Sequence, residues 1–106
     1  MKSTRSYHDD LMEDLKDPKE TAAYLNQALE EGSQPAFLLA LRNVLDAQGG
    51  MSKFSQATKI NRVSLYKMLS KDGNPEWESI LALLEALKIK FQVVTIRESK
   101  IHKKAA

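Results

Sequence analysis

The chain has 106 residues, which allow one domain with a modest core, and its 42% hydrophobic and 28% charged residues are ordinary for a folded protein. It has no cysteine, which excludes disulfides and thiolate metal sites, and no apolar stretch near the roughly 20 residues that a transmembrane helix needs. The first ten residues lack the apolar core of a signal peptide, so we expect a cytoplasmic protein.

The net charge of +2 hides an uneven distribution along the chain. Residues 1–50 carry five Lys or Arg against nine Asp or Glu, whereas residues 51–106 carry eleven against five. A basic half suits a polyanion such as DNA, and an acidic half suits a basic protein or stays away from phosphates. We therefore expect different partners for the two halves, although an ordinary solvated surface also fits the acidic one.

Residues 1–16 are polar and acidic, with Tyr7, Leu11 and Leu15 at four-residue spacing. This spacing is typical of a short helix with one apolar side, but so few residues form only a marginal helix in water. We therefore predict a flexible or marginally helical segment, or one that folds on a partner.

Two helices are predicted to form a scaffold. Asp17 is suited to cap the first, Pro18 suits its first turn, and the helix should run from about 18 to 31. The second should begin near Pro35 and end before Gly49. Their apolar residues, at the spacing of a buried helix face, are Ala22, Leu25, Ala28, Leu29, Phe37, Leu38, Leu41, Val44 and Leu45.

Residues 51–71 are the most informative segment, because they hold five basic residues, no acidic ones, and two short helical patterns around a tight turn. This combination is typical of a helix-turn-helix that reads DNA. If the second helix begins after Asn61, one side of it is apolar and the other is polar and basic. The apolar side comprises Leu65, Met68 and Leu69, with Phe54, Ala57 and Ile60 as partners, and the opposite side comprises Arg62, Val63, Tyr66, Lys67 and Ser70.

The side chains of this segment suit contacts to DNA. Arg62 can donate two hydrogen bonds to a guanine edge, and Lys67 and Lys71 can neutralise phosphates. Asn61 and Ser52 are predicted to cap the two helices, whose first amides can then face a phosphate. Ser64, Tyr66 and Ser70 can contact bases or backbone. A solvated surface on an ordinary helical domain is the alternative interpretation.

A further helix is predicted over residues 75–88, with Asn74 as its cap and Pro75 as its first residue. Its apolar side should close the core over the other four helices. Stacking of the tryptophan on a base is a less favoured alternative to core packing. The apolar residues are Trp77, Ile80, Leu81, Leu84 and Leu87.

Residues 90–97, KFQVVTIR, are rich in β-branched residues and predict a strand. A lone strand needs a partner for its backbone hydrogen bonds, and no second strand is evident in the sequence. The favoured partner is the same strand of a second subunit, which gives a homodimer through residues 90–97, and a different protein is the alternative. Residues 98–106 form a basic tail that we expect to be disordered.

The segments AAYLNQALEEG, LALRNVLDAQGGMS and SLYKMLSKDGNP together are quite specific. Through them the chain resembles, over roughly residues 7–94, the small Xre-type addiction-module antidote proteins, which are HigA-like antitoxins. The resemblance implies a lambda-repressor-like fold. The combined expectation is a mainly α fold, in which residues 17–97 form a five-helix helix-turn-helix domain with a short C-terminal β-strand.

The resemblance also implies a function. Such a protein dimerises on a palindromic operator in double-stranded DNA, represses its own operon, and neutralises a RelE-like toxin that cleaves messenger RNA. The base-facing residues would be Arg62, Val63, Ser64, Tyr66 and Lys67, and the backbone contacts Ser52, Gln56, Asn61 and Lys71. The motif commonly has Gly with positive φ where this chain has Lys59, which predicts a slightly altered turn. Because the toxin should be basic, its candidate contacts are Asp9, Asp10, Glu13 and Asp14.

Two other function classes fit the sequence less well. A protein-interaction module, or a plain regulator without a toxin, is the alternative to a DNA-binding antitoxin. An enzyme has little support, because the only histidines are His8 and His102, cysteine is absent, and no phosphate-binding loop or metal-ligand cluster is evident. We therefore expect no catalytic residue, no metal and no cofactor.

Overall fold

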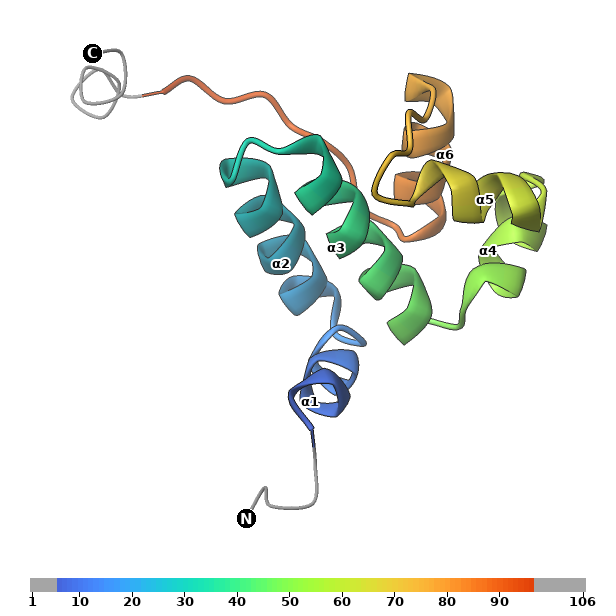
Figure 1. Ribbon diagram of the computed structural model, residues 1–106. Coiled ribbons are helices and arrows are strands. Elements are labelled where there is room, and N and C mark those ends of the chain that lie inside the picture. Colours follow the sequence, from blue (N-terminus) through green and yellow to red (C-terminus); the bar gives the residue numbers. More distant parts are fainter. Residues whose placement is uncertain (1–5, 97–106) are drawn as a thin grey trace.

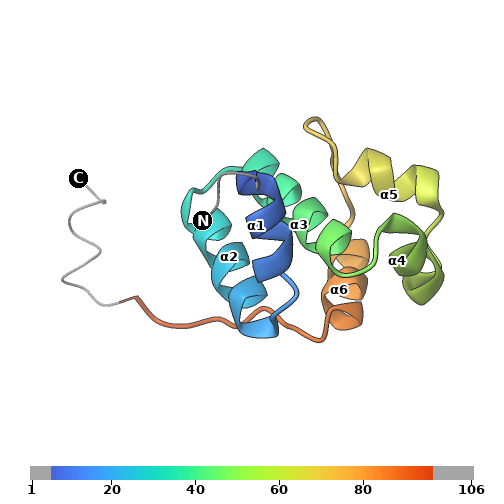
Figure 2. The ribbon, with the colours of Figure 1, turned by 90° about the horizontal axis from the view of Figure 1, so that it is seen from below.

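A computed structural model describes residues 6–96, and within that range the chain forms six helices and no strand. The helices are α1 Tyr7–Asp14, α2 Pro18–Glu30, α3 Gln34–Ala47, α4 Met51–Thr58, α5 Arg62–Met68 and α6 Trp77–Ala86. Figures 1 and 2 place α1 and α2 at one end of the molecule and α4 and α5 at the other. The predicted tail, residues 98–106, lies outside the described residues.

The prediction of five helices and a C-terminal β-strand is wrong, although the fold is mainly α. The additional helix is α1, whose N-cap Ser6 accepts a hydrogen bond from the Asp9 amide at 3.0 Å. Residues 89–96 are not a strand but an irregular segment that follows α6. A β-branched composition favours extended backbone but does not supply the hydrogen-bonded neighbour that a strand requires, and residues 6–96 contain none.

The centre of the fold is α3, which packs against α1, α2 and α4. Three of its side chains, Leu41, Val44 and Leu45, are fully buried. The second layer forms around α4, which packs against both α5 and α6 and contributes the buried ring of Phe54. The position of α5 is therefore set mainly by its packing against α4.

The predicted helix starts were right in the first half of the chain and wrong twice in the second. The Asp17 side chain accepts a hydrogen bond at 3.0 Å from the amide two residues later, so it caps α2 as predicted. Ser52 and Asn74 were predicted as caps, but α4 follows Gly50 and α6 follows Glu76. The helix predicted from residue 75 therefore begins two residues later.

The predicted core side of α6 was partly wrong. Trp77 is 63% exposed and Leu81 is also exposed, whereas Leu83, which the predicted apolar stripe omitted, is fully buried. The side chains four residues apart at 77 and 81 share one face of the helix, and this face turns outward. The buried face instead centres on the positions of Ile80 and Leu84.

Candidate nucleic-acid interface

The two sides predicted for α5 are confirmed by burial. Leu65 and Leu69 are buried and Met68 is partly buried against the core. The five residues proposed to face bases are all exposed: Arg62, Val63, Ser64, Tyr66 and Lys67. The seven-residue helix thus presents a polar and basic side to solvent while its other side holds it to the protein.

The connection between α4 and α5 is a tight turn fixed by side-chain hydroxyls. Ser55 Oγ donates to the Ile60 carbonyl oxygen at 2.6 Å. Thr58 Oγ1 donates to the Phe54 carbonyl oxygen at 2.7 Å and accepts from the Ile60 amide at 3.2 Å. These hydroxyls were not singled out from the sequence, because their partners depend on the conformation of the turn.

Lys59 was expected to alter the turn because it replaces the usual Gly, but it adopts the positive φ of that position. Its φ is 65° and its ψ is 20°, which is the left-handed conformation usually given to Gly. For a residue with a Cβ, this conformation costs roughly 1 kcal/mol. The turn is therefore kept without glycine, rather than replaced by a different one.

Asn61 caps α5 as predicted. Its Oδ1 accepts hydrogen bonds from the Val63 amide at 2.7 Å and from the Ser64 amide at 3.4 Å. The carbonyl oxygen of the side chain is therefore used inside the protein, and the side-chain amide is the part of Asn61 suited to donate to a DNA phosphate.

The structure places the remaining predicted contacts beside α5. Ser52 and Gln56 are exposed on α4, and Lys71 is exposed in the turn after α5. The start of α4 has no side-chain cap hydrogen bond among the described residues, because its cap is Gly50. Ala57, predicted to pack under α5, is exposed instead.

Arg42 on α3 joins this surface, and the sequence interpretation missed it. Its guanidinium carbon lies 5.2 Å from the centre of the Tyr66 ring, and that of Arg62 lies 6.0 Å from the same centre. Both distances are typical of cation–π contacts. The only signal in the sequence was that Arg42 is the single basic residue between Lys19 and Lys53.

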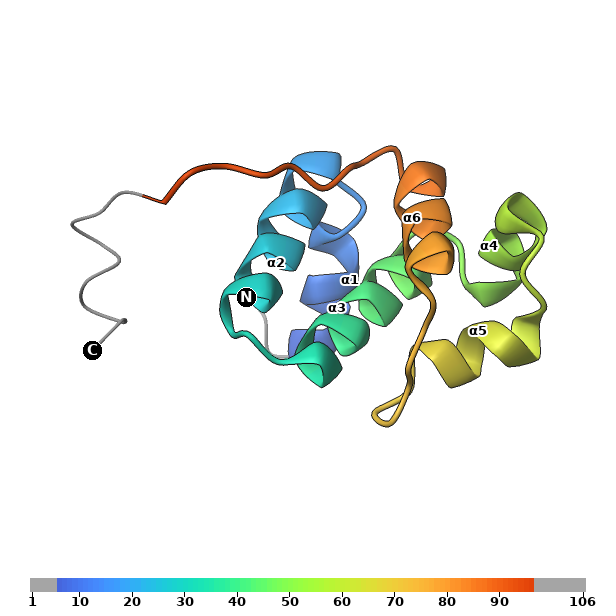
Figure 3. The ribbon, with the colours of Figure 1, turned by 90° about the horizontal axis from the view of Figure 1, so that it is seen from above.

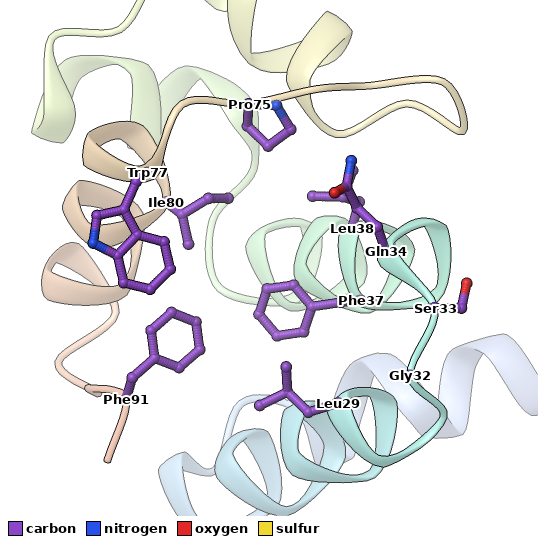
Figure 4. Close-up of a pocket in the computed structure, with 10 residues that line it drawn as sticks. All are labelled: Leu29, Gly32, Ser33, Gln34, Phe37, Leu38, Pro75, Trp77, Ile80 and Phe91. Atoms are coloured by element: carbon purple, nitrogen blue, oxygen red, sulfur yellow. The ribbon is translucent and has the colours of Figure 1, made fainter. Parts of the chain in front are cut away.

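A second surface is an apolar groove of about 390 Å³ between α2, α3 and α6, shown in Figure 4. Phe91 lies between two other rings, stacked on Trp77 at 5.4 Å and tilted against Phe37 at 6.0 Å. The side chains of Leu29 and Ile80 also line it. We call these five residues the aromatic groove.

Residues 6–96 contain no group of three or more His, Cys, Asp or Glu placed to hold a metal ion. None of the helices in the same range is long and apolar enough to cross a membrane.

Comparison with known proteins gives the family. A model of the family described as "Probable addiction module antidote protein" matches residues 6–95. The chain belongs to this antidote family. An uncharacterized protein of Haemophilus influenzae is 36% identical over 84 residues, which are 79% of this chain and 86% of that protein. No solved structure matches the chain.

The antidote family confirms the coarser part of the resemblance found in the sequence. It is a family of antidotes and not of enzymes, and an antidote implies a toxin as its partner.

Proposed function

We propose that this antidote protein is a DNA-binding repressor of its own operon, acting in the cytoplasm, and that α4 and α5 form an Xre-type helix-turn-helix. The observation that carries the proposal is the exposed basic side of α5, held in place by a capped start and a hydroxyl-fixed turn. A short helix with a rigid entry suits insertion into a major groove.

The proposed roles follow from the chemistry of each side chain. Arg62 donates to a guanine edge, while Val63, Ser64, Tyr66 and Lys67 face the neighbouring bases. Ser52, Gln56, Asn61 and Lys71 contact the DNA backbone. The uncapped first turn of α4 supports a phosphate at Ser52, because free amides at a helix start attract anions.

Replacing Arg62 or Lys67 by Ala should weaken binding to a duplex from the chain's own promoter without unfolding the protein. We expect a loss of about 1–3 kcal/mol for Arg62 and a loss for Lys67 as well, in both cases for the correct sequence and not for a scrambled one. Fluorescence anisotropy at several salt concentrations measures both. Lys19→Ala on α2 is the matched control, and unchanged affinity in both α5 variants would reject the recognition helix.

The toxin is proposed to be RelE-like and to bind the acidic end of the molecule. Asp9, Asp10, Glu13 and Asp14 all lie on α1, at the end opposite to α4 and α5 in Figure 1. A toxin that cleaves messenger RNA should be basic, and a basic protein is attracted to this end. Co-purification with the product of the neighbouring reading frame tests the pairing, and a neighbour that is neither small nor basic would contradict it.

A homodimer is proposed to form through the aromatic groove and the exposed apolar residues beside it. Trp77 is exposed although it is large and apolar, and Leu81 lies one turn further on the same helix face. Two-fold pairing also matches a palindromic operator. This interface replaces the paired strands predicted from the sequence.

Trp77→Glu should therefore convert the dimer to a monomer in light scattering at micromolar concentration. A carboxylate at this position cannot be buried in an apolar interface without a large desolvation cost. Tyr7→Glu is the control, because Tyr7 is also an exposed aromatic residue but lies on α1. A monomeric mass for the unmodified protein, free and on DNA, would refute the dimer.

The same exposed groove favours a second candidate function, a protein-interaction module without sequence-specific DNA binding. The two candidates differ in one measurement. A promoter duplex that binds no tighter than a scrambled duplex of equal length would favour the interaction module.

A further inference from the structure

A second groove lies between α3 and the end of α5. Its volume is about 420 Å³, and it is lined by Pro35, Ala36, Leu39, Arg42, Leu69, Ser70 and Lys71. The α3 residues among them share one helix face, because positions 35, 39 and 42 are spaced by four and three residues. The opposite wall is Leu69, the C-cap of α5, and the turn that follows it.

Charge and surface chemistry both fit a DNA strand. Two of the lining side chains, Arg42 and Lys71, are cationic, Ser70 has a hydroxyl, and no acidic residue lines the groove within the described chain. The floor is apolar, and Leu39 is 59% exposed there. A deoxyribose–phosphate chain has the complementary character, with anionic oxygens and apolar sugar faces.

Contacts on both sides of the groove fix its shape. Gln34 Nε2 donates to the Gly73 carbonyl oxygen at 2.9 Å, which ties the start of α3 to the turn after α5. Figure 3 shows this turn projecting beside α5. On the opposite side of the groove, the guanidinium of Arg42 contacts the Tyr66 ring, which holds it near the base-facing side of α5.

We propose that this groove binds a backbone phosphate of the DNA, with Arg42 and Lys71 as its cationic contacts and Tyr66 as the residue that positions Arg42. The inference rests on the proposed DNA binding and extends the interface from α4 and α5 to α3. Arg42 is suited to this task because its planar guanidinium stacks on the ring while its N–H groups donate to phosphate oxygens.

The test measures binding of the promoter duplex across a salt series for Arg42→Gln, Arg42→Lys and Lys71→Gln. For Arg42→Gln we expect about a tenfold loss of affinity for promoter and scrambled duplexes alike, and a salt slope reduced by about one. Arg42→Lys should keep the slope, because it keeps the charge. Lys19→Gln changes the net charge equally on α2 and should change neither quantity.

The positioning role of Tyr66 has its own readout. In a Tyr66→Leu background, Arg42→Gln should cost less than in the unmodified protein, because the ring that orients Arg42 is already absent. Equal costs in both backgrounds would overturn the role of Tyr66.

The outcomes separate this inference from the function on which it rests. If the unmodified protein binds promoter DNA and Lys67→Ala weakens it, but Arg42→Gln and Lys71→Gln keep the full salt slope, the groove proposal is wrong. If the unmodified protein binds no DNA, the proposed function fails first. Should Arg42→Gln melt at a lower temperature, its salt slope is measured at a temperature where the variant stays folded, and a full slope there overturns the proposal.

Discussion

Replacing Leu65 by Ala is expected to lower the free energy of unfolding by about 2–5 kcal/mol. Leu65 is fully buried and is the residue through which the centre of α5 reaches the core. A helix of seven residues has little stability of its own, so tertiary packing has to hold it. The truncated side chain leaves a cavity beneath the helix, and promoter binding should fall as the helix loosens.

The matched control is Val63→Ala on the same helix. Val63 is 64% exposed, so its truncation should change the unfolding free energy by no more than about 0.5 kcal/mol. Urea denaturation monitored by circular dichroism measures the unfolding free energy of both variants. Similar midpoints for the two would mean that α5 is not anchored through Leu65. Weaker promoter binding by Val63→Ala at unchanged stability would separate the DNA-facing side from the core-facing side.

The parts of the fold that the sequence predicted correctly depend on interactions between near neighbours. The two sides of α5 follow from helical periodicity, and the caps at Asp17 and Asn61 need only an oxygen two or three residues before a free amide. For this reason the sequence was sufficient to predict the polar side of α5.

The errors concern features that depend on which distant segments meet. Trp77 was predicted in the core, but it is exposed and stacks on Phe91 from the segment after α6. The same segment was predicted as a strand because its β-branched side chains are visible in the sequence, and the missing partner strand was attributed to a second subunit. Arg42 was missed for a similar reason, since it lies 24 positions from Tyr66 and meets it only through the packing of α3.

Under the proposed function, the two ends of the molecule have different charge and different partners. The acidic α1 and the basic α5 lie at opposite ends, with α3 between them. In that proposal, a molecule bound to DNA through α5 presents α1 on the side away from the DNA. This arrangement would permit one molecule to bind DNA and toxin together. Substitutions on α5 should then weaken DNA binding alone, and substitutions on α1 should weaken toxin binding alone.

Gly73→Ala should destabilise the protein by about 1–3 kcal/mol, because the turn after α5 has no room for a methyl group. A Cβ at this position would overlap the Met68 carbonyl oxygen and would lie 2.8 Å from that of Lys67. The turn cannot move away freely, because the Gly73 amide donates to the Ser70 carbonyl oxygen at 2.9 Å and its own carbonyl oxygen accepts from Gln34. Asn74→Ala, at an exposed neighbouring position, is the control and should be nearly neutral.

Hydrogen exchange can show which part of the protein Gly73→Ala disturbs. The crowded carbonyls belong to the last turn of α5, so hydrogen exchange should accelerate first at the Leu69 amide, which donates to the Leu65 carbonyl oxygen at 3.1 Å. The amide of Leu45, inside the fully buried part of α3, should exchange at a rate set by global unfolding alone. Equal acceleration at both amides would show that Gly73 stabilises the whole fold. A larger acceleration at Leu69 than at Leu45, with weaker promoter binding at a temperature where the protein stays folded, would show that this glycine sets the end of the DNA-facing helix.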